Sequence, residues 1–333
     1  METSFTDVPE LPAPPASKRR RGMVEERRHP DLYFEDGNLV LSAMDEETAL
    51  DHNTEHQIVT FFRVHRSILA KHSPVFRDML AFPTPQDVER YDGVPHVRLY
   101  DSCDDLTGFL TAFYEPLYIP PEHYDGAFSK KMLGPLKLAT KYQVDSLRAR
   151  IISQVRKDWP STLKAWDKRF SPMHDERGPS HPDPLHSINL AYKGGICDEI
   201  PTELGLMFYQ LSVDLHPPDD LDTIASCLQL PAFLRLLKGR ERLNSFMFKT
   251  IGEVVSLPCT KPECDQTAFW RHIFLDPSLQ EFGWRGTRDP LGLIYMTLEY
   301  DGRLCHTCCR EYCRRFKGCR QAIFGALPSL FRA

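Results

Sequence analysis

The stretch from Ile58 to Leu80 constrains the fold more than any other part of the chain. Its first part, as far as Val64, is rich in β-branched and aromatic residues and predicts a strand. Ser73 and Pro74 predict a new helix start, because serine can accept a hydrogen bond from an unpaired amide and proline has no amide at the first helical position. The apolar residues that follow share one helical face: Val75, Phe76, Met79 and Leu80. A strand, a helical turn and a second helix in so short a segment favour an interaction module over an active-site scaffold.

The same stretch resembles the signature of BTB/POZ domains, in which a strand ending in His leads to Leu-Ala, then Ser, two residues and Phe, then Met-Leu. The residues that the resemblance assigns to the signature and to a dimer interface are Val64, His65, Ile68, Leu69, Ser73, Phe76, Met79 and Leu80. The resemblance implies an α+β fold, with a small mixed sheet capped by helices, and a module that pairs with itself. The alternative is an unrelated α+β domain with the same order of strand and helices.

Changes in composition predict five segments. The N-terminal residues are rich in proline and charge, and a second proline-rich stretch surrounds Gly178. The segments are a disordered tail at 1–28, a BTB/POZ core at 29–125, the C-terminal helices of the BTB region at 126–168, a linker at 169–188 and a mostly helical, cysteine-containing C-terminal domain at 189–333. The ending from Ala322 to Phe331 is loosely similar to that of BTB-domain proteins of basidiomycete fungi.

Patterns of apolar, turn and capping residues predict individual elements within these segments. In the core they predict a strand at Asn38–Leu41, an inserted, acidic and exposed loop at Ser42–Gln57, a turn at Asp92–Gly93, a strand at Val97–Tyr100 and a helix that begins at Asp104. Further helices are predicted at 127–165, Glu203–Leu211, Leu221–Leu237, Arg240–Val255, Thr267–Leu275 and from Cys305 onward.

The chain carries none of the short motifs that mark common catalytic sites. It has no Gly-x-x-x-x-Gly-Lys phosphate loop, no Gly-x-Gly-x-x-Gly, no Gly-x-Ser-x-Gly and no His-Glu-x-x-His. The acidic pair Asp104–Asp105 lies where the positive end of a helix favours negative charge, which accounts for it without catalysis. The sequence therefore predicts a protein that is not an enzyme.

Cysteines are concentrated in the C-terminal domain. Four of them form two short-spaced pairs: Cys259 with Cys264, and Cys305 with Cys308. A tetrahedral zinc site takes four thiolates, and two turns with one pair each can present them at suitable positions. We therefore predict one structural zinc held by these four residues. Cys309 or Cys313 is an alternative ligand, and reduced cysteines packed in a helical core are the alternative to a metal site.

The N-terminal tail contains four consecutive cations, Lys18, Arg19, Arg20 and Arg21, which resemble a nuclear import signal. The alternative is a solubilising or weakly nucleic-acid-binding arm. The formal net charge of −5 gives no overall attraction to nucleic acid or to an anionic membrane. No apolar run approaches the roughly 20 residues needed to cross a bilayer. We expect an intracellular protein, in the nucleus or the cytoplasm with the nucleus favoured, that has neither a membrane nor a nucleic-acid partner.

Together these observations predict a non-enzymatic protein that binds itself and other proteins through a BTB/POZ domain. One alternative is a substrate adaptor of a cullin-type ubiquitin ligase. BTB proteins of that kind carry an apolar-x-Glu element before the helix that begins here at Asp104, whereas this chain has Asp101, Ser102 and Cys103 there. The other alternative is a BTB-containing transcription regulator, which the basic tail and a zinc site would suit.

Overall fold

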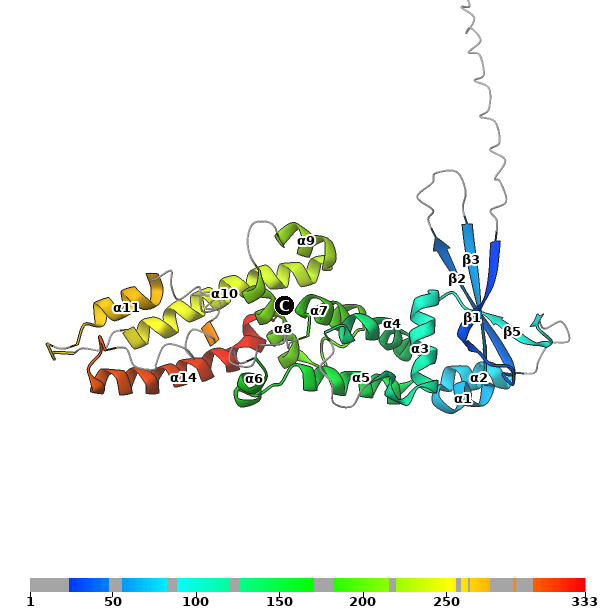
Figure 1. Ribbon diagram of the computed structural model, residues 1–333, viewed down its shortest axis with the longest axis horizontal. Helices are drawn as coiled ribbons and strands as arrows, with labels where there is room; N and C mark the ends of the chain where they lie inside the picture. Colours follow the sequence, from blue (N-terminus) through cyan, green and yellow to red (C-terminus); the bar gives the residue numbers. More distant parts are fainter. Residues whose placement is uncertain are drawn as a thin grey trace, which may run out of the picture. The chain divides into compact units, whose positions relative to one another are not determined.

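The computed structural model of the chain describes residues 24–47, 56–82, 89–119, 126–170, 182–215, 220–255, 259–262, 264–275, 290–291 and 302–332. These residues form a small five-stranded mixed sheet and a set of α-helices, so the predicted α+β class is confirmed (Figure 1). The chain divides into two compact units. One unit holds the sheet and comprises residues up to Val64 together with 86–103. The other comprises 65–85 and the chain from Asp104 onward.

The strands of the sheet unit are β1 (Val24–Tyr33), β2 (Leu39–Glu47), β3 (His56–Val64), β4 (Arg90–Tyr91) and β5 (Val94–Arg98). The helices are α1 (Arg66–His72), α2 (Pro74–Ala81), α3 (Cys103–Tyr114), a 3-10 turn η1 (Pro116–Tyr118), α4 (Phe128–Lys141), α5 (Asp145–Asp158), α6 (Leu163–Phe170), α7 (Pro184–Lys193), α8 (Pro201–Asp214), α9 (Asp220–Cys227), α10 (Leu230–Val255), α11 (Gln266–Leu275) and α14 (His306–Leu330).

The strands lie in the order β1-β3-β2-β5-β4. β2 pairs antiparallel with β3 and parallel with β5, and β1 runs parallel to β3. A tight turn joins β4 to β5, and its two residues, Asp92 and Gly93, have positive φ angles of 50° and 78°. The predicted turn at these residues is therefore confirmed, and glycine at the second position suits the left-handed backbone.

The predicted exposed loop at Ser42–Gln57 is wrong at both ends. β2 continues to Glu47 and β3 begins at His56, while residues 48–55 lie outside the described part. The reason is that the residues from Ala43 to Glu47 pair with β3, from Thr60 back to His56, so the strand continues through the acidic residues. Ser42 and Ala43 are buried, and the Ser42 hydroxyl is bonded to the His96 ring, with 2.8 Å between Oγ and Nε2. Pairing with β3 outweighs the weak strand signal of the sequence.

The last strand also differs from its prediction. β5 spans Val94–Arg98, whereas the sequence predicts a strand at Val97–Tyr100. Because the turn at Asp92–Gly93 is a tight hairpin, pairing resumes directly after it. Tyr100 lies beyond the strand and is 89% exposed.

The sheet curls so that its outer strands approach each other. Asp92, in the turn between β4 and β5, accepts hydrogen bonds from Arg28 (2.6 Å) and Tyr33 of β1. Burial, together with the bond to Asp92, raises the pKa of Tyr33 to about 12. The rings of Phe61 on β3 and Tyr91 on β4 stack with centroids 3.9 Å apart. Side chains from both edges therefore meet across the sheet.

In the helical unit, a single residue, Ser73, separates α1 from α2. The Ser73 hydroxyl accepts a hydrogen bond from the Phe76 amide (3.0 Å) and donates one to the Tyr142 carbonyl (2.6 Å). Pro74 occupies the first helical position, and the Phe76 ring packs 4.5 Å from the Tyr142 ring. The predicted order of strand, short helix and newly capped helix is therefore confirmed as local structure.

α7, which begins inside the predicted linker, packs against α4 and α5. The Trp159 indole, at the end of α5, donates to the Ser187 hydroxyl of α7 (3.3 Å), which also lies 2.9 Å from the Ser129 hydroxyl of α4. The Arg148 guanidinium of α5 pairs with the Glu199 carboxylate before α8 (Nη1 to Oε2, 2.9 Å). The predicted linker at 169–188 stays a prediction, although its last residues belong to α7. Residues 171–181 of that segment lie outside the described part.

α8 and α10 also pack against α14, and α10 and α14 run side by side (Figure 1). Phe208 of α8 stacks on Phe331, which follows α14, with centroids 5.9 Å apart. The sequence predicts helices at Leu221–Leu237 and Arg240–Val255, whereas the structure places the break earlier: α9 ends at Cys227, and α10 runs without interruption for 26 residues from Leu230. Gly239 lies inside it, and a side chain there would overlap the Phe331 ring. The glycine thus marks close packing rather than a helix end.

No helix among the described residues is both long enough and apolar enough to span a membrane.

Candidate metal centre

Two short segments bring the four predicted cysteines together. Cys259 and Cys264 lie in the connection between α10 and α11, Cys305 is the N-cap of α14, and Cys308 lies in its first turn. Main-chain hydrogen bonds hold these segments. The Cys264 amide bonds to the Lys261 carbonyl (3.1 Å), and the Asp265 amide bonds to the Arg303 carbonyl (2.8 Å). The second of these bonds joins the two cysteine pairs directly through the backbone.

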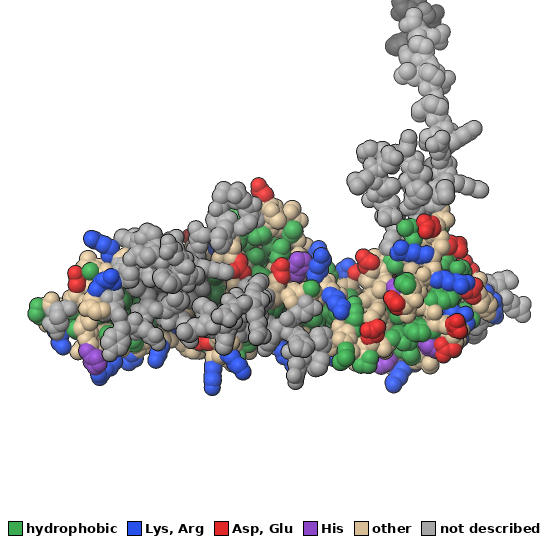
Figure 2. Space-filling model, in the orientation of Figure 1, with side chains coloured by type: hydrophobic (Ala, Val, Ile, Leu, Met, Phe, Trp, Pro, Cys, Tyr) green, Lys and Arg blue, Asp and Glu red, His purple; other side chains and the backbone are tan. Residues whose placement is uncertain are grey.

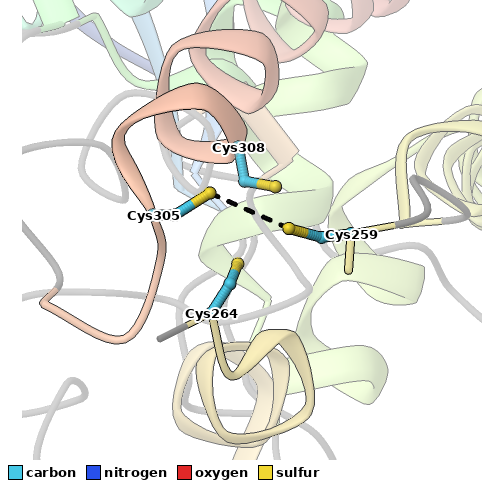
Figure 3. A group of neighbouring side chains, drawn as sticks. All are labelled: Cys259, Cys264, Cys305 and Cys308. Carbon is cyan, nitrogen blue, oxygen red and sulfur yellow. Dashed lines mark hydrogen bonds between the residues drawn. The ribbon is translucent and has the colours of Figure 1, made fainter. Parts of the chain in front are cut away.

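The four sulfur atoms converge on one point. All of them lie within 4.8 Å of one another, and the side chains point inward from their separate segments (Figure 3). Cys305 and Cys308 are buried, while Cys259 and Cys264 are half-buried. The Cys259 and Cys305 sulfurs are 3.8 Å apart, too far for a disulfide, and the chain's cysteines are free. Four thiols arranged in this way can hold a metal ion.

The separation of the sulfurs can be compared with a known coordination geometry. Zinc–thiolate bonds of about 2.3 Å at tetrahedral angles place neighbouring sulfurs roughly 3.8 Å apart. The Cys259–Cys305 distance of 3.8 Å agrees with that value. Among the residues that the structure describes, these four cysteines form the one group of three or more metal-binding side chains so arranged.

The thiols differ in their electrostatic surroundings. The Cys308 amide, at the positive end of α14, donates to the Cys305 sulfur and lowers the pKa of Cys305 to about 7. Burial raises the pKa of both Cys264 and Cys308. The Gln266 side-chain amide donates to the Cys308 sulfur (3.4 Å). Such N–H donors stabilise thiolate charge, which is the form that binds a metal.

An aromatic cluster lies next to the thiols, and its Tyr312 is close enough to Cys308, Cys264 and Cys259 to interact with them electrostatically. Phe269 and Trp270 of α11 pack against Tyr312 and Phe316 of α14, with the Trp270 and Tyr312 centroids 5.3 Å apart. Tyr312 and Phe269 are almost fully buried. Chain order did not reveal this cluster, because its members come from two helices that are well separated in the sequence.

Two cysteines that the sequence offered as alternative ligands lie outside the group. Cys309 and Cys313 are half-buried on α14. Successive residues of an α-helix are rotated by about 100°, so Cys309 cannot face the point that Cys308 faces. The sequence analysis also missed the supporting groups Gln266 and Arg303. The only available signal was that they lie beside the cysteines in the chain.

The residues of the predicted interface are divided between interior and surface. Buried members are Val64, Leu69, Ser73 and Phe76, and half-buried members are His65, Ile68, Met79 and Leu80. His65 is the N-cap residue of α1, and its main-chain amide lies 3.1 Å from the Tyr114 hydroxyl. The predicted import signal, Lys18 to Arg21, lies outside the described residues.

Comparison with known proteins supplies no relative. No protein-family model, no curated protein and no solved structure matches the chain. What can be inferred about function rests on the residues and their geometry.

Proposed function

We propose that this protein is a non-enzymatic interaction protein that pairs with itself through a BTB/POZ-like module and carries one structural zinc in its C-terminal part. The observation that supports the module most is the arrangement of Ile58–Leu80. A strand passes into two short helices that are separated by the buried, doubly bonded Ser73.

The pairing surface that we favour lies on α1 and α2. Phe76 is fully buried within the chain, so it belongs to the core rather than to an interface. Ile68, Val75 and Met79 are half-buried, and Phe82, at the end of α2, is 74% exposed. Large apolar side chains that remain accessible on two adjacent helices are typical of a contact with a partner.

The test is the oligomeric state of the full-length protein. Sedimentation equilibrium at micromolar concentration should show a dimer, and Phe82→Glu should shift it toward monomer because a charge replaces exposed apolar surface. Leu117→Glu is the matched control, since Leu117 on η1 is 76% exposed but lies outside the proposed surface. A wild-type protein that stays monomeric throughout this range would rule out self-association.

The zinc proposal rests on the donor set of the centre. Soft thiolates in a tetrahedral arrangement select zinc or an iron–sulfur site rather than magnesium or calcium. Four protein ligands would complete the coordination and leave no position for a substrate, so the role is structural. The metal would join the segment before α11 to the start of α14.

Elemental analysis of the purified protein tests this proposal. We expect one zinc per chain, and Cys305→Ser should abolish it, because three thiolates hold the ion much more weakly. Cys227→Ser, at an exposed cysteine of α9, should leave the zinc in place. Iron in place of zinc, or a fully folded protein without metal, would contradict it.

A further inference from the structure

One face of α10 carries a row of exposed apolar side chains. Eight large apolar side chains are exposed among the described residues, and four of them lie on this helix: Leu230, Leu234, Leu237 and Phe248. Their spacing keeps all four on a single helical face, which we call the α10 stripe. Leu230 and Phe248, at its two ends, are 67% and 69% exposed. Figure 2 shows apolar side chains at the surface over α9 and the start of α10.

Two exposed charges lie at the middle of the stripe. Glu241 follows Leu237 by one helical turn, so it lies on the apolar face itself. Lys238 lies three residues before Glu241, on the flank of the stripe. Neither side chain forms a hydrogen bond or an ion pair with the part of the chain that the structure describes. Both charges are therefore available to a second molecule.

We propose that the α10 stripe pairs antiparallel with the α10 stripe of a second copy of this chain. A two-fold axis at the level of Gly239 places Leu230 opposite Phe248 of the second copy. The same axis places Lys238 opposite Glu241 of the second copy. Because such a contact is symmetric, each of these pairs occurs twice.

The argument for a second copy is that the stripe is complementary to itself. Read in the reverse direction, it brings apolar residues together at both ends and a cation against an anion at the centre. A parallel arrangement would instead bring Glu241 against Glu241 and Lys238 against Lys238, and like charges so placed repel. Charge complementarity therefore selects both the partner and its antiparallel orientation.

This contact is separate from the pairing surface on α1 and α2 and does not depend on it. Only one helix of each copy takes part, so the contact is small and we expect it to be weak. It should form at protein concentrations above those at which the chain pairs through α1 and α2. In dilute protein the α10 stripe stays exposed.

Sedimentation equilibrium of the full-length protein, over a concentration series that extends well above the micromolar range, tests the contact. We expect a further association step at high concentration. Phe248→Glu should weaken this step by about tenfold or more, because a charge replaces apolar surface at the contact. Leu117→Glu is the matched control, since Leu117 is 76% exposed but lies on η1, outside both surfaces.

A charge exchange gives the sharper test. Lys238→Glu and Glu241→Lys should each weaken the association, because each brings like charges together. The double variant Lys238→Glu, Glu241→Lys should restore it, because the two ion pairs form again with their signs exchanged. A variant that merely misfolds cannot produce this recovery.

Three outcomes would overturn the proposal: no association at high concentration, association that Phe248→Glu leaves unchanged, and no recovery in the double variant. Repeating the series in a Phe82→Glu background separates this contact from pairing through α1 and α2. There the α10 contact should convert monomers to dimers. If pairing through α1 and α2 fails, the same series and the same charge exchange still decide the α10 contact.

Discussion

Two parts of the helical unit are held together in different ways. The helical core, formed by α4, α5, α7 and α8, buries long runs of apolar side chains, and α8 is buried along almost its whole length. The cysteine-rich end, residues 259–262, 264–275 and 302–316, has a small aromatic cluster and four convergent thiols. Apolar burial stabilises the first part without any ligand. The second part has a small core, and a metal or another cross-link usually supplies the missing stability in such cases.

The largest expected effect tests this contrast directly. Chelation, or Cys305→Ser, should unfold the cysteine-rich end and leave the helical core folded. Zinc bound to a small four-ligand site contributes about 10–16 kcal/mol in isolated peptides, more than this end can replace. Hydrogen exchange read by mass spectrometry should show loss of protection at 302–316 and none at 201–214. Unchanged protection at 302–316 in the metal-free protein would mean that the two parts are held in the same way.

A substitution in the helical core should give the next largest effect. Phe208→Ala should lower the free energy of unfolding by about 3–5 kcal/mol, because it leaves a cavity beside Phe331. Phe248→Ala is the control, since Phe248 on α10 is 69% exposed and should change stability by no more than about 0.5 kcal/mol. Urea denaturation measures both. Similar values for the two variants would argue against tight packing of α8 on the end of α14.

Replacing two glycines of α10 by alanine should change the stability of the protein in opposite directions. Gly239→Ala should destabilise the protein by about 1–3 kcal/mol, because the added methyl group overlaps the Phe331 ring. A methyl group added at Gly252 would meet no packing partner within 4 Å among the described residues, so Gly252→Ala should stabilise the helix by about 0.5–1 kcal/mol. Thermal unfolding distinguishes them. Stabilisation by both substitutions would show that α10 and α14 pack more loosely than the structure indicates.

A more local destabilisation is expected at the break between α1 and α2. Ser73→Ala should cost about 1–2 kcal/mol, since it removes the helix cap and leaves the Tyr142 carbonyl without this donor. Ser67→Ala, at an exposed position of α1, serves as the control and should be nearly neutral. If urea denaturation gave equal stabilities for the two variants, the hydrogen bonds of Ser73 would not stabilise the fold.

The sequence predicts caps and turns correctly where contacts between neighbouring residues decide the structure. The cap at Ser73, the turn at Asp92–Gly93 and the acidic start of α3 each depend on contacts within a few residues. The predictions at Ser42–Gln57 and at the interior of α10 were wrong for a common reason. β2 extends because Ala43–Glu47 pair with β3, and the glycine inside α10 is explained by the distant Phe331 ring, which occupies the space of a side chain at Gly239.

The four convergent cysteines show the same division. Their spacing in two short pairs indicated them as candidate ligands, because residues so close in the chain can lie on one turn. Spacing could not decide between Cys308 and Cys309, since the choice depends on where α14 begins and which way its first turn faces. It also gave no sign of the Asp265–Arg303 main-chain bond that joins the two segments.

By itself, then, the sequence determined the class of fold, the order of strand and helices from Ile58 to Leu80, and the residues that can bind a metal. These follow from side-chain chemistry and from periodicities of a few residues, which a linear chain displays directly. Tertiary structure alone decided the extent of β2, the continuity of α10, the packing of α5 against α7 and the convergence of the four thiols. Each of these depends on contacts between residues far apart in the chain, and their free energy exists only once the helices and strands have packed.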